Sequence, residues 1–420
     1  MNPTLVAGAI FFLTYALIVS ERVHRTVSAL LGGMLMIFTG VLSQNRAFRA
    51  VDWNVIFLLL GMMAIAAVLR ETGLFQWIAV HAVRLGKGHP FRILVILCAV
   101  TAVSSAFLDN VTVVVLVAPI TLFVAANLGL RPLPFLIGEV LSANIGGTAT
   151  LIGDPPNILI GSAAKIDFLT FLLHMGPIST IILVAFLVLS WFLFRDDLRP
   201  RADWRFDIDA LEVTDLITDR AGLFKSLVVM GLVIVGFLLS GLLHLEPASI
   251  AMAGATLLML WTGSEPSRIL REVEWTTLLF FVGLFVVVEG VAQVGLISLV
   301  AQAALQVTGG DLPLTSLLIL WLSAFISGIV DNIPYAATMI PLVSSLGQTM
   351  AIEPLWWSLA LGACLGGNAT LVGASANVVV ASLGARSGSP IGFRQFLRYG
   401  IITTLMSLVL SSVYIWLRYL

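Results

Sequence analysis

Residues 146–153 read GGTATLIG, and residues 366–373 read GGNATLVG. The second stretch follows the first by 220 positions. Nearer the start of each copy, VDW at 51–53 matches VEW at 273–275 with an offset of 222. Apolar segments of similar composition do not keep such a register by chance, so the sequence predicts an internal duplication.

The composition indicates that both copies lie in a membrane. Of the 420 residues, 59% are hydrophobic and 11% are charged, whereas soluble domains carry about 25% charged residues. At about 20 apolar residues per span, the chain has room for roughly ten to twelve crossings. The sequence contains no polar stretch of domain size and no GxxxxGK[ST] motif. We therefore expect an all-α polytopic membrane protein that is neither an enzyme nor an ATP-driven pump.

Four apolar segments are interrupted by polar, Gly-rich or Pro-rich patches: 93–127, 132–162, 314–346 and 356–385. Backbone that leaves the helix inside a bilayer is tolerated only where protein or a water-filled cavity satisfies it. The first and third segments are therefore predicted to be re-entrant hairpins, and the other two are predicted to be unwound transmembrane helices. The predicted domains are a first repeat over 1–194, a linker over 195–225 and a second repeat over 226–420.

The basic residues predict the orientation of the chain. If the loop at 21–25 is cytoplasmic and both hairpins return to the side that they enter, most of the 22 Lys and Arg residues are cytoplasmic. Four of them fall outside: Arg46, Arg49, Lys165 and Arg418. This distribution obeys the positive-inside rule. It predicts a plasma (inner) membrane protein with both termini outside and a cytoplasmic linker. The two hairpins then open to opposite sides, so the repeats are inverted, as in many secondary transporters.

The interruptions carry groups that suit a small polar solute or an ion. Glycine pairs at 146–147 and 366–367 permit unwound backbone. Hydroxyl and amide side chains follow them, beside half-helix ends that carry partial charge. The candidate substrate and ion site combines residues of both copies: Asp109, Asn110, Thr112, Asn144, Gly147, Thr148, Thr150, Asp154, Asn157, Asp331, Asn332, Gly367, Asn368, Thr370 and Asn377.

Three aspartates are the principal titratable groups of this site. Asp109 and Asp331 stand at the hairpin tips, where Asp favours a helix N-cap. Capping does not exclude a ligand, because a carboxylate in a membrane usually marks an ion or proton route. Asp154 has Ala374 as its repeat partner. An unpaired acid in a duplicated site suits a coupling ion, while the following Pro155 also suits a cap, and the sequence leaves both interpretations open.

The other reactive residues do not indicate a second site. Glu139 and Glu289 lack acidic repeat partners, so we expect them to have helix-packing or interface roles. Cys98 and Cys364 are too few for a metal site, and none of the five histidines is grouped with a ligand-like partner. No metal and no cofactor are therefore expected.

The motifs resemble those of one transporter family. They are FLDNVT at 107–112, NIGGTATLIGDPPN at 144–157, VDNIP at 330–334 and GGNATLVGASAN at 366–377. They resemble the ArsB/P-protein branch of the ion transporter superfamily, which includes ArsB/NhaD-like permeases. The resemblance covers nearly the whole chain outside the linker. It implies scaffold helices around a transport core and elevator-type alternating access driven by an ion gradient.

The resemblance first implies arsenite or antimonite efflux coupled to proton influx. Neutral As(OH)3 needs hydrogen-bond partners, and the Asn, Thr and backbone groups at the breaks could provide them. Sodium/proton antiport and a P-protein-like anion pathway or channel are the alternatives. The expected partners are a small inorganic substrate, protons or sodium, and the lipid bilayer, with no nucleic acid. We expect a monomer or homodimer, with a soluble ATPase as an optional partner.

Single cysteines at four loop positions would test the predicted topology. A membrane-impermeant thiol reagent should label cysteines at Gln44 and Gln348 from outside, and those at Gly88 and Ser387 only from inside, as the distribution of basic residues requires. Labelling of positions 88 and 348 from the same side would contradict the inverted repeats.

Overall fold

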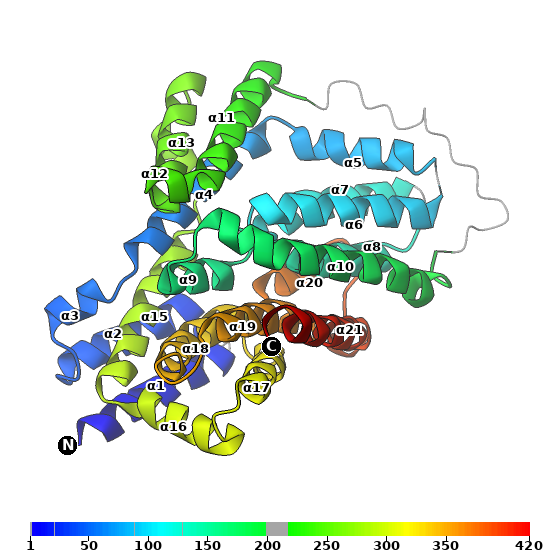
Figure 1. The fold of residues 1–420 in the computed structure, drawn as a ribbon. Helices are drawn as coiled ribbons and strands as arrows, with labels where there is room; N and C mark the ends of the chain where they lie inside the picture. The colour runs from blue at the N-terminus through cyan, green and yellow to red at the C-terminus, as the bar shows by residue number, and fades with distance from the viewer. Residues whose placement is uncertain (1, 21, 88, 128, 199–216) are drawn as a thin grey trace.

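The computed structural model describes residues 2–20, 22–87, 89–127, 129–198 and 217–420 (Figure 1). Every regular element in these ranges is a helix, which confirms the predicted all-α fold. The first copy contains α1 (Pro3–Ser20), α2 (Arg25–Phe38), α3 (Gln44–Arg49), α4 (Trp53–Glu71), α5 (Leu74–Leu85), α6 (Pro90–Phe107), α7 (Asn110–Asn127), α8 (Leu133–Gly147), α9 (Pro155–Ala164) and α10 (Phe168–Phe194). The second copy contains α11 (Arg220–Leu238), α12 (Ser240–Leu243), α13 (Pro247–Thr262), α14 (Pro266–Arg271), α15 (Trp275–Gln293), α16 (Leu296–Thr308), α17 (Leu312–Ser327), α18 (Asn332–Leu346), α19 (Glu353–Gly366), α20 (Ser375–Arg386) and α21 (Phe393–Tyr419).

Many of these helices have the length and composition of membrane spans. Among the described residues, seven helices are long and apolar enough to cross a bilayer: α1, α4, α6, α10, α11, α15 and α21. The pair α16 and α17 forms an eighth candidate, with a bend of 119° between the two helices. A span needs about 20 mainly apolar residues. The chain is therefore a multi-pass membrane protein, as its composition predicts.

Helices of the two copies correspond one to one over much of the chain. The helices α3 to α7 begin 222 positions before α14 to α18, and α8 and α9 begin 220 positions before α19 and α20. The predicted breaks recur in this scheme, at residues 148–154 and 367–374. The inverted insertion of the copies and the depth of the hairpins refer to a bilayer and stay predictions.

The two copies pack on each other through small residues. Helix α4 of the first copy packs on α13 of the second, and α15 of the second packs on α2 of the first. A Cβ atom on Gly61 would lie 2.7 Å from the carbonyl carbon of Ala251. Its repeat partner Gly283 lies in the same way against Ala29, at 2.5 Å. Small residues of this kind let membrane helices approach closely. Each copy therefore contributes one helix to each of these two closely packed pairs.

The first glycine of each pair, Gly146 or Gly366, serves helix packing. Helix α8 packs on α6, and α19 packs on α17. A Cβ on Gly146 would lie 2.1 Å from the carbonyl oxygen of Ala102, and one on Gly366 would lie 2.5 Å from that of Ala324. Gly146 and Gly366 remain inside their helices, and the backbone leaves the helix only after them. The breaks begin directly after Gly147 in the first copy and at Gly367 in the second, so the first glycine of each pair serves helix packing and the second marks the end of the helix.

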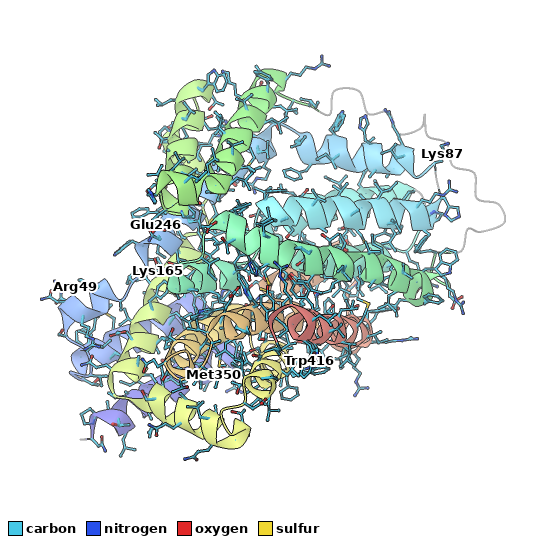
Figure 2. The ribbon with its side chains drawn as sticks, viewed as in Figure 1. Arg49, Lys87, Lys165, Glu246, Met350 and Trp416 are labelled. Atoms are coloured by element: carbon cyan, nitrogen blue, oxygen red, sulfur yellow. The ribbon has the colours of Figure 1, made fainter. Side chains whose placement is uncertain are left out.

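Charged side chains at the two ends of the molecule are well separated. Figure 2 shows Arg49 and Lys165 toward one end and Lys87 toward the opposite end. The predicted orientation places the first two outside and Lys87 in the cytoplasm, so their separation fits that prediction. Which end faces the cytoplasm stays a prediction.

The linker is shorter than the predicted 195–225. Helix α10 ends at Phe194, but α11 already begins at Arg220. The side chain of Asp219 accepts a hydrogen bond from the backbone N–H of Gly222 at 2.8 Å and caps this helix. The linker residues 199–216 lie outside the described ranges. The charges near Arg220 therefore belong to the first turn of a helix and not to the linker.

Substitution of Gly146 by alanine should destabilise the protein. The added methyl group would collide with the backbone of α6, and overpacking of this kind costs about 1–3 kcal/mol. Gly231→Ala in α11 is the matched control, because a Cβ at Gly231 meets nothing within 4 Å. Thermal unfolding of both purified variants in detergent measures the difference. Equal unfolding temperatures would contradict the close packing of α8 on α6.

Candidate functional site

Four helices begin where the two copies meet. Helices α7 and α18 follow the hairpin tips at Asp109 and Asp331, and α9 and α20 follow the two breaks. Helix α7 contacts α20, and α9 contacts α18. The N-terminus of a helix carries unpaired N–H groups and about half a positive charge. The site therefore combines positive helix ends with the polar side chains at the tips and breaks.

Asn157 holds the first break. Its side-chain amide donates hydrogen bonds to the carbonyl oxygens of Gly147 at 3.2 Å and Thr150 at 3.0 Å. The hydroxyl of Thr150 donates in turn to the carbonyl of Ala106 near the end of α6. A buried polar group without a partner costs about 1–3 kcal/mol. Asn157 therefore replaces hydrogen bonds that the unwound backbone has lost.

Asn377 holds the second break by equivalent contacts. Its amide donates to the carbonyl oxygens of Gly367 and Thr370, both at 2.8 Å. The hydroxyl of Thr370 donates to the carbonyl of Gly328 at 2.6 Å, at the position that corresponds to Ala106. The correspondence of the two copies thus extends to individual hydrogen bonds.

Buried amides join the two breaks. The side-chain nitrogen of Asn144 donates to the amide oxygens of Asn368 at 2.8 Å and Asn377 at 3.0 Å. The amide oxygen of Asn144 accepts from Asn110 at 3.0 Å. All four side chains are buried, so they satisfy one another. We call these residues, Asn110, Asn144, Asn368 and Asn377, the amide cluster.

The hairpin tips are capped by their aspartates, as predicted. Asp109 accepts from the backbone N–H groups of Val111 at 3.0 Å and Thr112 at 3.1 Å. Asp331 accepts from the backbone N–H of Ile333 at 3.1 Å. The second carboxylate oxygen of Asp109 accepts from the hydroxyl of Thr112. The two tips differ in the groups that contact this second carboxylate oxygen.

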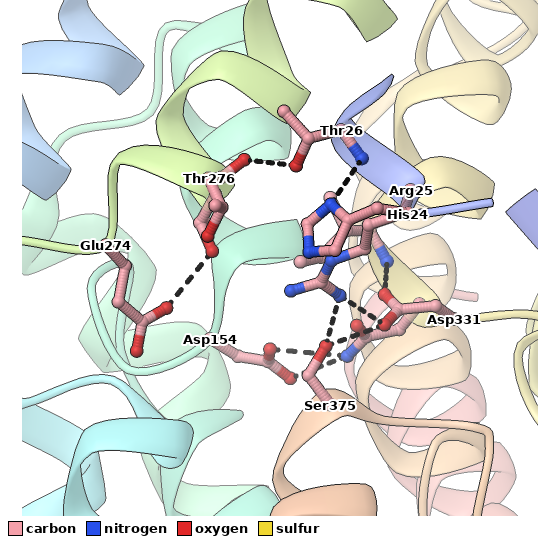
Figure 3. A network of polar contacts seen from close by, with 11 residues as sticks. His24, Arg25, Thr26, Asp154, Glu274, Thr276, Asp331 and Ser375 are labelled. Carbon is pink, nitrogen blue, oxygen red and sulfur yellow. Dashed lines mark hydrogen bonds and ion pairs between the residues drawn. The ribbon is translucent and has the colours of Figure 1, made fainter. Parts of the chain in front are cut away.

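Arg25, the first residue of α2, pairs with Asp331 (Figure 3). Its guanidinium lies 3.1 Å from the second carboxylate oxygen of Asp331 and donates to the hydroxyl oxygen of Ser375 at 2.6 Å. Ser375 donates to the same carboxylate oxygen at 2.7 Å. The guanidinium also lies over the ring of Phe280, 5.5 Å from its centre. Asp331 therefore has a cation supplied by the protein, whereas Asp109 forms no ion pair within the described ranges.

The sequence-based site omits Arg25. The residue follows a charged loop and is 306 positions from Asp331 in the chain, so its charge suggests only a cytoplasmic location. One signal could have found it: the repeat partner of Arg25 is Pro247. A charged residue whose repeat partner is uncharged, such as Arg25 or Asp154, is therefore a signal for a functional position.

Asp154 binds a side chain of the other copy and does not cap its own helix. Both of its carboxylate oxygens accept from the side-chain amide of Asn332, at 3.2 and 3.1 Å. The residue precedes α9 without making a side-chain cap hydrogen bond. It is 1% exposed and forms no ion pair with a described residue. Of the two interpretations that the sequence leaves open, the helix cap is not formed here, and a role in binding or coupling an ion stays a prediction.

Within the described ranges, Thr148 and the two membrane glutamates, Glu139 and Glu289, form no hydrogen bond with the side chains of the amide cluster or with the three aspartates. The hydroxyl of Thr148 donates to the backbone carbonyl one turn earlier in α8, at 2.7 Å. Glu139 is buried and accepts from the hydroxyl of Thr121. Glu289 pairs with Arg46 at 2.7 Å. The contacts of the two glutamates agree with the packing roles expected for them.

A helical membrane fold with two corresponding halves, broken helices and buried polar groups at the breaks defines a membrane transporter. Comparison with known proteins agrees with this class. The family model described as citrate transporter, CitMHS, matches residues 15–362. The chain belongs to this family, within the ion transporter superfamily.

Individual relatives extend the comparison. An uncharacterised transporter of Mycobacterium tuberculosis is 46% identical over 425 residues, which cover 99% of each chain. The P protein of Homo sapiens is 34% identical over 496 residues, which cover 98% of this chain and 59% of that longer protein. The structure of the YdaH transporter of Alcanivorax borkumensis is similar with a TM-score of 0.64, over 99% of this chain and 98% of that one, at 16% identity. The last similarity concerns the fold alone, and the P protein relationship confirms the suspected branch.

Arg25→Gln should destabilise the protein, because Asp331 would keep its charge without a cation. We expect a loss on the order of 1–2 kcal/mol, near the lower end for charged hydrogen bonds, since the Arg25 side chain is 31% exposed. Adding Asp331→Asn should recover much of the loss, because the two residues interact directly. Thermal unfolding of the two single variants and the double variant gives the interaction energy. Strictly additive losses would contradict a direct pair.

Proposed function

We propose that this protein is a secondary active transporter whose acidic centre binds a proton or a sodium ion and couples it to the movement of a small solute. The charge imbalance at the breaks carries this proposal. Asp109, Asp154 and Asp331 lie at the tips and breaks, and Arg25 is the one guanidinium that contacts any of them in the described ranges. Carboxylates in a membrane usually serve ion or proton routes. Because Arg25 already pairs with Asp331, Asp109 and Asp154 are the proposed cation ligands.

The proposed substrate is arsenite or antimonite, exported as the neutral hydroxide in exchange for protons. A centre with excess carboxylate disfavours a multiply charged anion and accepts a neutral hydroxide. The hydroxyls of such a substrate could bond to amide, hydroxyl and carbonyl groups at both breaks, which would offset the cost of removing them from water. The amide cluster would have to rearrange during transport, because its members bond to one another in this conformation.

Sodium/proton antiport is a second candidate, and the mutual bonding of the amide cluster favours it. With the amides satisfied, the groups that remain for a ligand are the carboxylates and the carbonyls at the breaks. These oxygen ligands suit a small cation in a transporter. Citrate, which the family's description specifies, carries several negative charges and would need accompanying cations at Asp109 and Asp154. A P-protein-like anion pathway would likewise need cationic groups, and Arg25 is already paired.

Transport by purified protein in lipid vesicles tests these alternatives. A pH gradient is imposed, an internal dye reports proton movement, and arsenite, antimonite, sodium and citrate are supplied one at a time. Proton movement that depends on arsenite or antimonite is the expected result. A response to sodium alone would favour the second candidate, and a response to citrate alone would replace the proposed substrate. Solute flux without any proton or sodium coupling would contradict secondary active transport.

Asp154→Asn should abolish coupling while substrate binding persists. The amide has the size of the carboxylate and can still accept from Asn332, but it cannot take up the coupling proton or balance a cation. Glu139→Gln is the matched control, since Glu139 is also a buried carboxylate but lies outside the tips and breaks and accepts from the hydroxyl of Thr121. Proton and solute fluxes measured in parallel give the coupling ratio. A wild-type ratio in Asp154→Asn would leave Asp109 as the remaining ligand.

A further inference from the structure

Three cavities follow one face of α4 from its first turn to its last. The α4 residues that line them are, in order, Asn54, Val55 and Leu58, then Leu58, Leu59, Met62, Met63 and Ala66, and finally Met63, Ala66, Ala67 and Arg70. Adjacent cavities share lining residues, so the three cavities are neighbours along this helix. Asp109 lines the middle cavity.

The first cavity is large and open. It has a volume of about 490 Å³ and lies between α4, the turn before α10 and the turn before α13. Exposed polar residues line its mouth: Asn54, Lys165, His244 and Glu246. Figure 2 shows Lys165 and Glu246 on the same side of the molecule. Water and small ions can therefore enter this cavity, and we call its side the Lys165 side.

An apolar constriction separates the first cavity from Asp109. Leu58 and Ile158 line both the first and the middle cavity, and they are 3% and 2% exposed. The middle cavity has a volume of about 10 Å³, which is about the space that one water molecule needs. Apolar constrictions of this kind control the passage of water and ions in membrane proteins.

The third cavity continues the line beyond Asp109. It has a volume of about 50 Å³, and Thr112, Glu272 and Glu274 line it opposite α4. The hydroxyl of Thr112 also donates to Asp109, so one side chain connects the carboxylate to this cavity. Arg70 and the exposed Glu272 form an ion pair there. The line of cavities therefore ends at a charged pair on the surface.

The matching place in the second copy keeps the aspartate but has a larger apolar side chain beside it. The counterpart of Asp109 is Asp331, and the counterpart of Leu58 is Phe280. Arg25 pairs with the first of these and lies over the second. A guanidinium of the protein thus occupies the position where a mobile cation would have to arrive.

We propose that the coupling cation reaches Asp109 along α4. It passes through the first cavity and the constriction formed by Leu58 and Ile158, and it leaves by way of Thr112 and the third cavity. The proposal rests on the proposed function, because the cation in question is the coupling ion. It adds a route for this ion, which runs through the first copy only. In the second copy the guanidinium of Arg25 occupies the matching position beside Asp331.

Cysteine protection by Ag⁺, a small monovalent cation that binds thiols, tests the route without a transport assay. Ala66→Cys places a thiol between the middle and third cavities. Val288→Cys at the repeat partner in α15 is the matched control, since both native residues are buried, at 4% and 7% exposure. Vesicles are treated with Ag⁺, the protein is unfolded, and unprotected thiols are alkylated. Peptide mass spectrometry then reads the introduced cysteine separately from Cys98 and Cys364.

Protection at position 66 and its absence at position 288 is the expected result. Equal protection at both positions, or protection at neither, would overturn the route. Wild-type vesicles that couple no proton or sodium ion to any solute would overturn the proposed function, while the labelling pattern would still decide the route.

Two alanine variants in the Ala66→Cys background test the constriction. Leu58→Ala should speed protection when Ag⁺ is added on the Lys165 side and not when it is added on the other. Leu60→Ala, on the same helix but lining none of the three cavities, should leave the rate unchanged. Equal rates in the two variants would overturn the assignment of Leu58 to the constriction.

Discussion

A peptide carbonyl inside a bilayer has no water to bond with, so a helix can unwind there only if the protein supplies the partners. Asn157 and Asn377 meet this constraint at the two breaks, each by donating to carbonyls of its own unwound segment. Asn144 then ties the first break to the second. The other features of the centre depend on these amides, because the helix ends that follow the breaks are positioned by the satisfied backbone.

Duplication alone would produce two equal halves, and single residues make them unequal. Asp154 adds an acid to the first copy where the second has Ala374, and Arg25 adds a base where the matching residue is Pro247. The guanidinium of Arg25 forms an ion pair with Asp331 at the hairpin tip of the other copy. The carboxylates without an ion pair in the described ranges, Asp109 and Asp154, therefore precede α7 and α9 of the first copy, and Asp109 also lines the middle cavity along α4.

The repeat register predicts the breaks and the capped tips, because these features depend on residues that are neighbours in the sequence. The pairing of Arg25 with Asp331 cannot be predicted in this way, because the two residues are 306 positions apart in the sequence. The charge of Arg25 suggests only a loop. Asp154 is ambiguous in the sequence for a related reason. Pro155 fits a cap, whereas the actual partner, Asn332, belongs to the other copy. Contacts between copies depend on helix packing, which a residue pattern does not specify.

The contact between Asp154 and Asn332 has a consequence for coupling because it joins the two copies. A ligand shifts a conformational equilibrium only by as much as its affinity differs between the two states. A proton or cation on Asp154 would change what this carboxylate can accept from Asn332, so its affinity would depend on whether the copies are in contact here. The pair at Asp331 lacks this property, since Arg25 is covalently part of the chain and carries its charge in every state. Under the proposed function, an ion bound at Asp154 would therefore influence how the copies meet, whereas the charge of Arg25 would not change between states.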